Sequence, residues 1–169
     1  MIEMDRPDSD RLEPDVAEPR WLTVAEQAVW RDYLDFSRRL HERLNRQLID
    51  DSALSLAEYE ILVQLSEHAD RQLRMSELAD LAVHSRSRLT HTVRRLEERG
   101  LVSRQECPDD RRGILCQLSD EGFRVLAEAA PGHVEAVRAG LFDPLGEADV
   151  EALGIVMRKA RSALGPGPA

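Results

Sequence analysis

The sequence predicts a mainly α-helical fold with one small β-hairpin. Several stretches carry apolar residues at helical spacing, and two of them begin with the Ser/Thr-x-x-Glu pattern of a capping box, at Thr23 and Ser55. One pair of short strand-like segments, 101–106 and 113–118, flanks the polar loop PDDRRG. Hydrophobic residues make up 42% of the chain and charged residues 33%, a composition typical of a soluble and largely helical protein.

The first predicted helix runs from Thr23 to about Asp50. Its apolar residues recur near the helical period and form a stripe. They are Trp30, Tyr33, Leu34, Leu40, Leu44 and Leu48. Because so long a helix cannot be buried inside a small domain, we expect a partner subunit to cover its exposed parts. Shorter helices are predicted at about 56–68 and 76–82, with a connector at 69–74 between them.

Two further helices are predicted after the hairpin. Ser119 is the expected N-cap of a helix that reaches about Phe142, with acidic residues in its first turn. Pro131-Gly132 lies inside this helix and predicts a kink or a local break there. The last helix is expected at about 147–164.

The segment 86–99 predicts a helix with one apolar and one polar side. At about 100° per residue, Leu89, Val93 and Leu96 fall within one narrow sector, which predicts the buried side. The opposite side carries Ser87, Arg88, His91, Arg94, Arg95 and Glu98, and five of these six residues can donate hydrogen bonds. Ser85 is the expected N-cap and Gly100 the expected stop. Together with the short helix before it, this segment predicts a helix-turn-helix.

Charge is distributed unevenly along the chain. The net charge is −9, which argues against a protein that binds nucleic acid over its whole surface. Residues 1–20 contribute −4, whereas residues 84–112 carry eight arginines against five acids and contribute +3. A basic helix beside a basic hairpin tip suits DNA, because a helix fits the major groove and a narrow arginine tip fits the minor groove.

These motifs, in this order, resemble the MarR family of winged helix-turn-helix regulators. The resemblance covers about residues 22–164 and is most specific at 84–122. That part resembles the family's recognition helix, its GLV strand start, its DxRG-type wing tip at 110–113 and its L-S/T-D/E-E-G helix start. The resemblance implies an obligate homodimer with interleaved first, fifth and sixth helices, a pseudo-palindromic operator and usually repression. It also implies a pocket between two lobes, where small aromatic or phenolic effectors often weaken DNA binding.

The expected organisation follows from this resemblance. A flexible acidic arm at 1–20 precedes a helical dimerisation lobe formed by 21–52 and 120–164. The winged helix-turn-helix lobe occupies 53–119, and 165–169 form a flexible tail. The expected partners are double-stranded DNA, a second copy of the chain and a small effector.

The candidate DNA contacts lie in the basic helix and the wing. Ser87, Arg88 and His91 are placed to read bases, and Arg94 and Arg95 to contact phosphate. Ser85 and Arg86, at the helix start, are further candidates for phosphate contact. In the DxRG pattern the acid aligns with Asp110 and the arginine with Arg112, so Arg112 rather than Arg111 is the expected minor-groove residue. The alternative for both elements is an ordinary solvated surface.

The family's effector pocket borders the first helix, so Trp30, Tyr33, Phe36 and His133 are candidate pocket residues. Plain core or dimer packing is the favoured alternative for each of them, because aromatic residues are only 4% of the chain.

Other functional classes find little support in the sequence. Cys107 and Cys116 lie on the two wing strands and could face each other, but silent free thiols are the favoured interpretation. The five histidines show no spacing typical of a metal site. No phosphate-binding glycine loop or catalytic constellation is present, so we expect neither enzyme activity nor a cofactor. No apolar run approaches the roughly 18 residues of a membrane span, and a cytoplasmic location is expected. The alternatives to a DNA-binding regulator are a redox- or metal-responsive regulator, and a winged-helix protein-interaction module.

Overall fold

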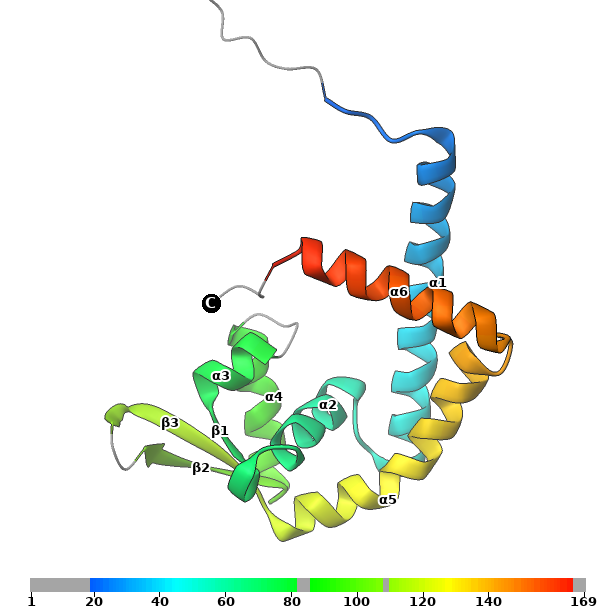
Figure 1. The fold of residues 1–169 in the computed structure, drawn as a ribbon. Helices are drawn as coiled ribbons and strands as arrows, with labels where there is room; N and C mark the ends of the chain where they lie inside the picture. The colour runs from blue at the N-terminus through cyan, green and yellow to red at the C-terminus, as the bar shows by residue number, and fades with distance from the viewer. Residues whose placement is uncertain (1–18, 82–85, 108–109, 166–169) are drawn as a thin grey trace, which may run out of the picture. The chain divides into compact units, whose positions relative to one another are not determined.

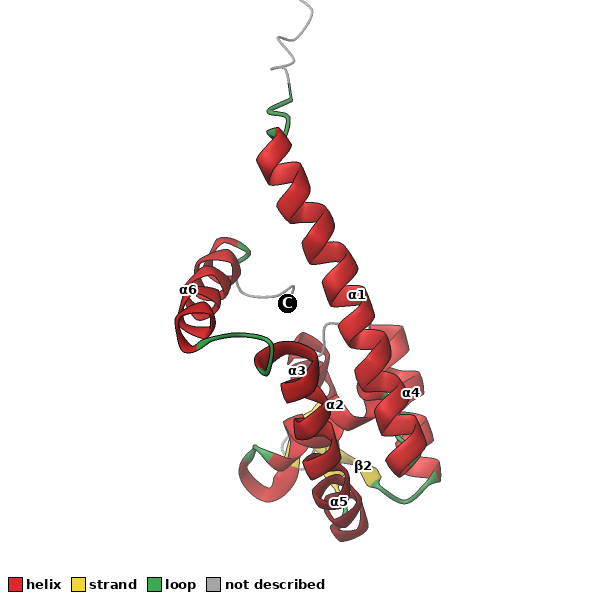
Figure 2. Cartoon of the chain, turned by 90° about the vertical axis from the view of Figure 1, so that its right-hand side faces the viewer, coloured by secondary structure: helices red, strands yellow, loops and turns green. Residues whose placement is uncertain are grey.

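The computed structural model describes residues 19–81, 86–107 and 110–165 (Figure 1). The chain divides into two compact units, Met1–Leu34 and Asp35–Ala169, and helix α1 (Val24–Ser52) runs through both. Most of the chain is helical and the strands form one small sheet (Figure 2), which confirms the predicted fold class. The predicted arm, up to residue 18, and the tail from residue 166 lie outside the described residues. No helix in the described ranges is long and apolar enough to cross a bilayer.

Helix α1 begins with the predicted capping box. The Thr23 backbone N–H donates to Glu26 Oε2 at 2.7 Å, and the Glu26 N–H donates to the Thr23 hydroxyl at 3.2 Å. Only the end of the apolar stripe is covered, since Leu44 and Leu48 are the buried residues of α1. Trp30 remains 52% exposed. The described chain therefore leaves much of this stripe open to solvent.

Three short helices follow α1. They are α2 (Leu56–Ser66), α3 (Met75–Leu81) and α4 (Arg86–Glu98), with the 3₁₀ turn η1 (Ala69–Arg71) after α2. Gly100 ends α4 as predicted, in a left-handed conformation with φ of 72°. The Leu101 N–H donates to the Leu96 carbonyl and the Gly100 N–H to that of Glu97, both at 2.9 Å, which is the hydrogen-bond pattern of a Schellman motif.

The sheet has three antiparallel strands in the order β1–β3–β2. They are β1 (Gln72–Arg74), β2 (Val102–Cys107) and β3 (Asp110–Leu118). The hairpin was predicted, although β3 begins within the expected loop. Strand β1 was not predicted, because its three residues include only one buried apolar side chain, Leu73, and its hydrogen bonds go to β3, distant in sequence.

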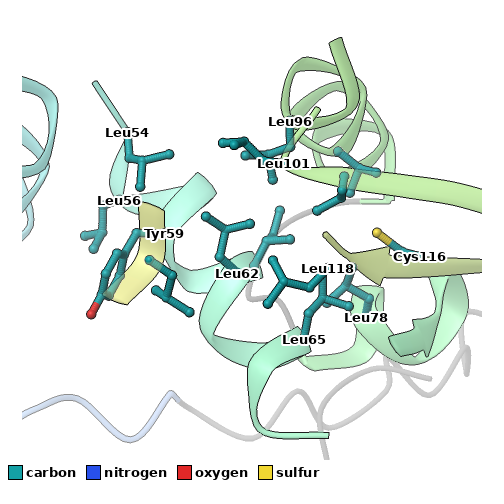
Figure 3. Close-up of a cluster of buried hydrophobic side chains, with 14 of the residues drawn as sticks. Leu54, Leu56, Tyr59, Leu62, Leu65, Leu78, Leu96, Leu101, Cys116 and Leu118 are labelled. Carbon is teal, nitrogen blue, oxygen red and sulfur yellow. The ribbon is translucent and has the colours of Figure 1, made fainter. Parts of the chain in front are cut away.

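A single apolar core joins these elements (Figure 3). Helix α2 contributes Leu62 and Leu65, which are completely buried. Leu78 from α3 and Leu96 from α4 are completely buried as well, and Cys116 of β3 lies beside them. Fully burying such a leucine contributes roughly 1.5–3 kcal/mol. The same core therefore holds α4 against the sheet and against α2.

Helix α5 (Asp120–Val137) starts at the predicted cap, where the Gly122 N–H donates to the Ser119 hydroxyl at 2.9 Å. Of the two outcomes expected at Pro131-Gly132, a kink or a local break, the break is absent, because α5 continues through Pro131. Packing on both sides compensates for the lost hydrogen bond, since Ala129 is buried before the proline and Val137 packs on the core after it. The irregularity lies further on, in the π-helical segment η2 (Arg138–Phe142). Helix α6 (Glu147–Ala163) follows and has no buried residue.

Candidate nucleic-acid interface

The two sides of α4 differ as the helical wheel predicted. Leu89 is 2% exposed, and Val93 and Leu96 are completely buried. The opposite side is exposed and carries Ser87, Arg88, His91, Arg94 and Arg95. Thr92 is also buried, and its hydroxyl donates to the Arg88 carbonyl at 3.0 Å, so burial leaves no unsatisfied hydroxyl. Packing on the core thus leaves the five donor residues on the opposite side of α4 exposed to solvent, and we call them the donor row of α4.

Glu58, in the first turn of α2, binds one of these donors. Its side chain is only 8% exposed, and its Oε1 accepts a hydrogen bond from Arg95 Nε at 3.1 Å. Its Oε2 accepts bonds from the backbone N–H and the hydroxyl of Ser55, both at 2.8 Å. Burial alone would raise the pKa of Glu58, but the hydrogen bonds from Ser55 and Arg95 outweigh it and lower the pKa. Glu58 is therefore a charged group with several fixed partners.

Replacing Glu58 with glutamine should make the stability of the protein less sensitive to acid. Because the pKa of Glu58 is below its ordinary 4.5 in the folded chain, the ionised form stabilises the fold above about pH 4.5. This contribution is lost as pH falls through the folded pKa. The free energy of unfolding, measured by urea denaturation between about pH 7 and pH 3, should therefore fall less in Glu58→Gln than in the wild type.

Glu60→Gln is the matched control for this measurement, because Glu60 is exposed on the same helix. Its acid dependence should follow that of the wild type. Parallel curves for the wild type and Glu58→Gln would contradict the stabilising role of the Glu58 charge.

Arg99 connects the C-terminal end of α4 to the corner between α1 and α2. Its Nη1 donates to the Ala53 carbonyl at 2.9 Å and lies 4.0 Å from Glu58 Oε2. Ala53 has a left-handed backbone with φ of 54°, where the chain turns out of α1. The Leu56 N–H donates to Asn45 Oδ1 of α1 at 3.0 Å. The corner is thus hydrogen-bonded to α1 on one side and to α4 on the other.

The basic stretch is more strongly paired with acids than its sequence indicated. Arg104 of β2 binds Glu97 of α4 through its backbone N–H and Nε, each at 3.0 Å, and through Nη2. Arg94 Nε lies 3.5 Å from Glu98 Oε1. The Ser55 capping box marked Glu58 as a helix-start carboxylate, but which arginine it would meet depends on the packing of α2 against α4, which local patterns do not reveal.

The wing is the β2–β3 hairpin. Asp110 starts β3 opposite Cys107, and the register is irregular between Glu106 and Cys107. Arg111 and Arg112 follow in the strand. Ser85 lies outside the described residues, as do the side chains of Arg86, Asp110, Arg111 and Arg112. The backbone therefore forms the predicted hairpin, while the contacts of these five side chains stay predictions.

The four predicted pocket residues have different surroundings. Trp30 and Tyr33 stack on each other, with ring centroids 5.8 Å apart. Phe36 borders an apolar cavity of about 440 Å³ together with residues of η2 and α6. His133 does not line that cavity, but packs on Tyr59 with ring centroids 4.4 Å apart. Its Nδ1 is buried without a hydrogen-bond partner among the described residues, and burial lowers the pKa of His133.

The two cysteines do not face each other across the hairpin, contrary to what the sequence allowed. Cys116 is paired with Arg104, whereas Cys107 is paired with Asp110. The two positions are thus separated along the strand by three residues, or about 10 Å, too far for the Cα separation of under about 7 Å that a disulfide needs. Both thiols are buried and unbridged. Among the described residues, no cluster of three or more His, Cys, Asp or Glu side chains is placed to hold a metal.

Cys116 should be almost inert toward alkylation in the folded protein. Burial raises the pKa of its thiol from 9.0 to about 12, so the reactive thiolate at pH 8 is about a thousandfold scarcer. Iodoacetamide labelling followed by peptide mass spectrometry should show slow modification of Cys116 in buffer and fast modification in urea. Equal rates in both would mean that the Cys116 thiol is accessible in the folded protein and would contradict its protection by burial.

Comparison with known proteins identifies the family. The model of the MarR family matches residues 54–114. Sco3205 from Streptomyces coelicolor, a MarR family transcriptional regulator crystallised in complex with DNA, is 47% identical, with a TM-score of 0.84 over 89% of this chain and 94% of that one. The chain belongs to the MarR family. AbsC, a MarR family regulator from the same organism, is 38% identical with a TM-score of 0.80 over 86% of this chain and 98% of that one.

This MarR family member is also similar to a curated regulator. PecS of Dickeya dadantii, an HTH-type transcriptional regulator, is 33% identical over 95 residues, which are 56% of this chain but only 57% of PecS. The relatives of this chain named here are thus transcriptional regulators, and regulation of transcription is a function other than catalysis. The predicted family and winged-helix fold are confirmed.

Proposed function

We propose that the protein is a sequence-specific DNA-binding transcriptional regulator that binds a palindromic operator as a homodimer and represses transcription. The exposed donor row of α4 carries this proposal. The opposite side of the helix is buried, so the core fixes the surface that these residues would present to DNA. The 47% identity to Sco3205, whose structure contains DNA, supports the same use of this surface.

In this proposal, α4 enters the major groove and the wing reaches the flanking minor groove. Ser87, Arg88 and His91 read bases, and Arg94 and Arg95 contact phosphate. Ser85 and Arg86 add phosphate contacts at the start of the helix. Arg112, assisted by Asp110, is the minor-groove residue of the wing, with Arg111 beside it.

The homodimer is supported by two apolar surfaces, each considered by itself. In α1, Trp30, Tyr33 and Leu34 are 45% to 52% exposed. In α6, Ile155, Val156 and Met157 are 41% to 57% exposed. Exposed apolar surfaces of this kind typically mark association sites. A second copy of the chain would cover them, giving a dimerisation lobe from 21–52 and 120–164 and a DNA-binding lobe from 53–119.

The proposal includes release by a small aromatic or phenolic effector. The apolar cavity of about 440 Å³ beside Phe36 has the size and lining that suit a small aromatic molecule. An effector that binds one dimer geometry better than another would shift the spacing of the two α4 helices. Operator titration with and without each candidate molecule tests this part, since an effector must change the dissociation constant.

Selection of bound sites from random DNA tests the main proposal. A dimer should select a palindrome whose half-sites lie about one helical turn apart. Binding to the selected site should weaken steeply with salt, because each neutralised phosphate releases counterions. Failure to enrich any site, with salt-independent binding to a protein partner, would instead indicate a protein-interaction module.

A further inference from the structure

Within the described part of the chain, the guanidinium of Arg95 is bound at one nitrogen only. Nε donates to Glu58 at 3.1 Å, and neither terminal nitrogen makes a hydrogen bond to another described residue. The side chain is 53% exposed, on the same side of α4 as His91 and Arg94. A guanidinium carries five N–H donors in a rigid fork, so fixing Nε orients the remaining donors without using them.

Glu58 is well suited to hold an arginine in one place. It is 8% exposed, its other oxygen is bound by the N–H and hydroxyl of Ser55, and Arg99 lies 4.0 Å away. The carboxylate therefore has little freedom to follow a moving arginine. Its position depends on the start of α2 and the corner at Ala53, where Arg99 is also bound.

We propose that Glu58 is a positioning residue for operator binding, which holds Arg95 by Nε so that its terminal nitrogens are pre-oriented toward one phosphate. This inference rests on the proposed function, because it assigns a role within the DNA-binding surface of α4. Glu58 itself touches no DNA in this arrangement. Glu58 contributes by restricting Arg95 before binding, so that the Arg95 side chain loses less conformational entropy when it binds the phosphate.

The two effects of Glu58 on DNA binding have opposite signs. A carboxylate near a phosphate backbone weakens simple attraction, so Glu58 disfavours loose binding to any DNA. At the operator, α4 is docked in one orientation and Arg95 must meet a particular phosphate, so a fixed guanidinium strengthens binding. Removing the charge should therefore raise affinity for random DNA and lower affinity for the operator. Loss of folding alone would lower both.

A double-mutant cycle on the full chain tests the inference. Dissociation constants are measured for the selected operator and for a random duplex of equal length. Glu58→Gln should lower the ratio of operator to random affinity by about three- to tenfold, a coupling typical of side chains in contact. In an Arg95→Ala background, the same substitution should change this ratio by less than about twofold. Arg95→Ala alone should reduce the slope of log affinity against log salt concentration by about one unit, the effect of losing one phosphate contact.

Two further variants separate positioning from stability. Ser55→Ala removes the capping hydroxyl but keeps the Glu58 charge, the bond from the Ser55 N–H and the contact to Arg95, so at an equal loss of stability it should reduce the affinity ratio less than Glu58→Gln does. Arg95→Lys keeps the charge but loses the fork, so it should reduce the ratio as Glu58→Gln does, even if Glu58→Gln folds poorly.

Two results would overturn the inference. In the first, folded Glu58→Gln protein shows operator affinity and random-DNA affinity shifted in the same direction. In the second, Glu58→Gln changes the ratio of these affinities as much in the Arg95→Ala background as in the wild type. A wild-type protein that prefers no selected site over random DNA would instead refute the proposed function. If the wild type prefers the operator but the double-mutant cycle shows no coupling between Glu58 and Arg95, only the role of Glu58 is refuted.

Discussion

Replacing Gly122 with alanine should lower the free energy of unfolding by about 3 kcal/mol, the upper part of the range for overpacked sites. Gly122 lies in the first turn of α5, against the chain that leaves α4. A Cβ atom at this position would lie 2.1 Å from the carbonyl oxygen of Leu101 and 2.7 Å from Cδ1 of Leu118. The first of these atoms belongs to the backbone, so a side-chain rotation cannot relieve the overlap.

The site leaves little room for adjustment, because the same carbonyl is part of a hydrogen-bonded junction. Leu101 O accepts the Ser119 N–H and hydroxyl, both at 3.0 Å. The Ser119 hydroxyl also lies 2.7 Å from the Gly100 carbonyl and accepts the Gly122 N–H. Moving Leu101 away from a new methyl group would therefore disturb the cap of α5 and the end of α4 together. We expect the wing and α4 to lose their fixed relation to α5.

Urea denaturation of Gly122→Ala, followed by circular dichroism, measures the effect. Gly154→Ala is the matched control, because Gly154 also lies within a helix and a Cβ there would meet only the flexible end of Arg158, at 3.2 Å. That substitution should be neutral or slightly stabilising, since alanine favours helix more than glycine does. A Gly122→Ala variant as stable as the control would show that the junction can open by about 0.9 Å, from 2.1 Å to the lower limit of 3.0 Å for a Cβ contact, without loss of stability.

The junction illustrates which features the sequence could predict. The Ser-Asp-Glu-Gly run predicted a helix start, because capping is a local interaction between residues three positions apart. The same reasoning predicted the stop at Gly100 and the buried side of α4. Local patterns did not explain why residue 122 is a glycine, since its neighbour Leu101 is brought close only by the folded hairpin.

The features missed by sequence analysis depend on contacts between distant segments. Strand β1 exists because β3 pairs with it, and Glu58 meets Arg95 because α2 packs on α4. The separation of Cys107 and Cys116 follows from the strand register, which places Cys116 opposite Arg104, three residues before Cys107. Pro131-Gly132 predicted a kink or a local break from local geometry alone, whereas packing of neighbouring residues keeps α5 continuous. In each case contacts between segments distant in sequence determine the structure, and the local sequence pattern does not specify those contacts.

Replacing Arg112 with alanine should weaken operator binding by about ten- to hundredfold, within the 1–3 kcal/mol of a well-placed arginine contact. The proposal places this residue in the minor groove, where a narrow groove concentrates negative potential. The unfolding temperature should change little, because the change replaces a polar residue near the hairpin turn and removes no apolar side chain from the core. Fluorescence anisotropy with the selected operator, at fixed salt, measures the affinity.

Arg111→Ala is the matched control, since it removes the same charge from the adjacent residue of β3. Both variants should lose the general electrostatic attraction of one arginine and so bind random DNA equally. Only Arg112→Ala should lose the additional affinity for the operator, because Arg112 aligns with the arginine of the DxRG pattern and Arg111 does not. Equal losses of operator affinity in the two variants would mean that the wing contributes only positive charge. A larger loss for Arg111→Ala would mean that Arg111, not Arg112, makes the minor-groove contact.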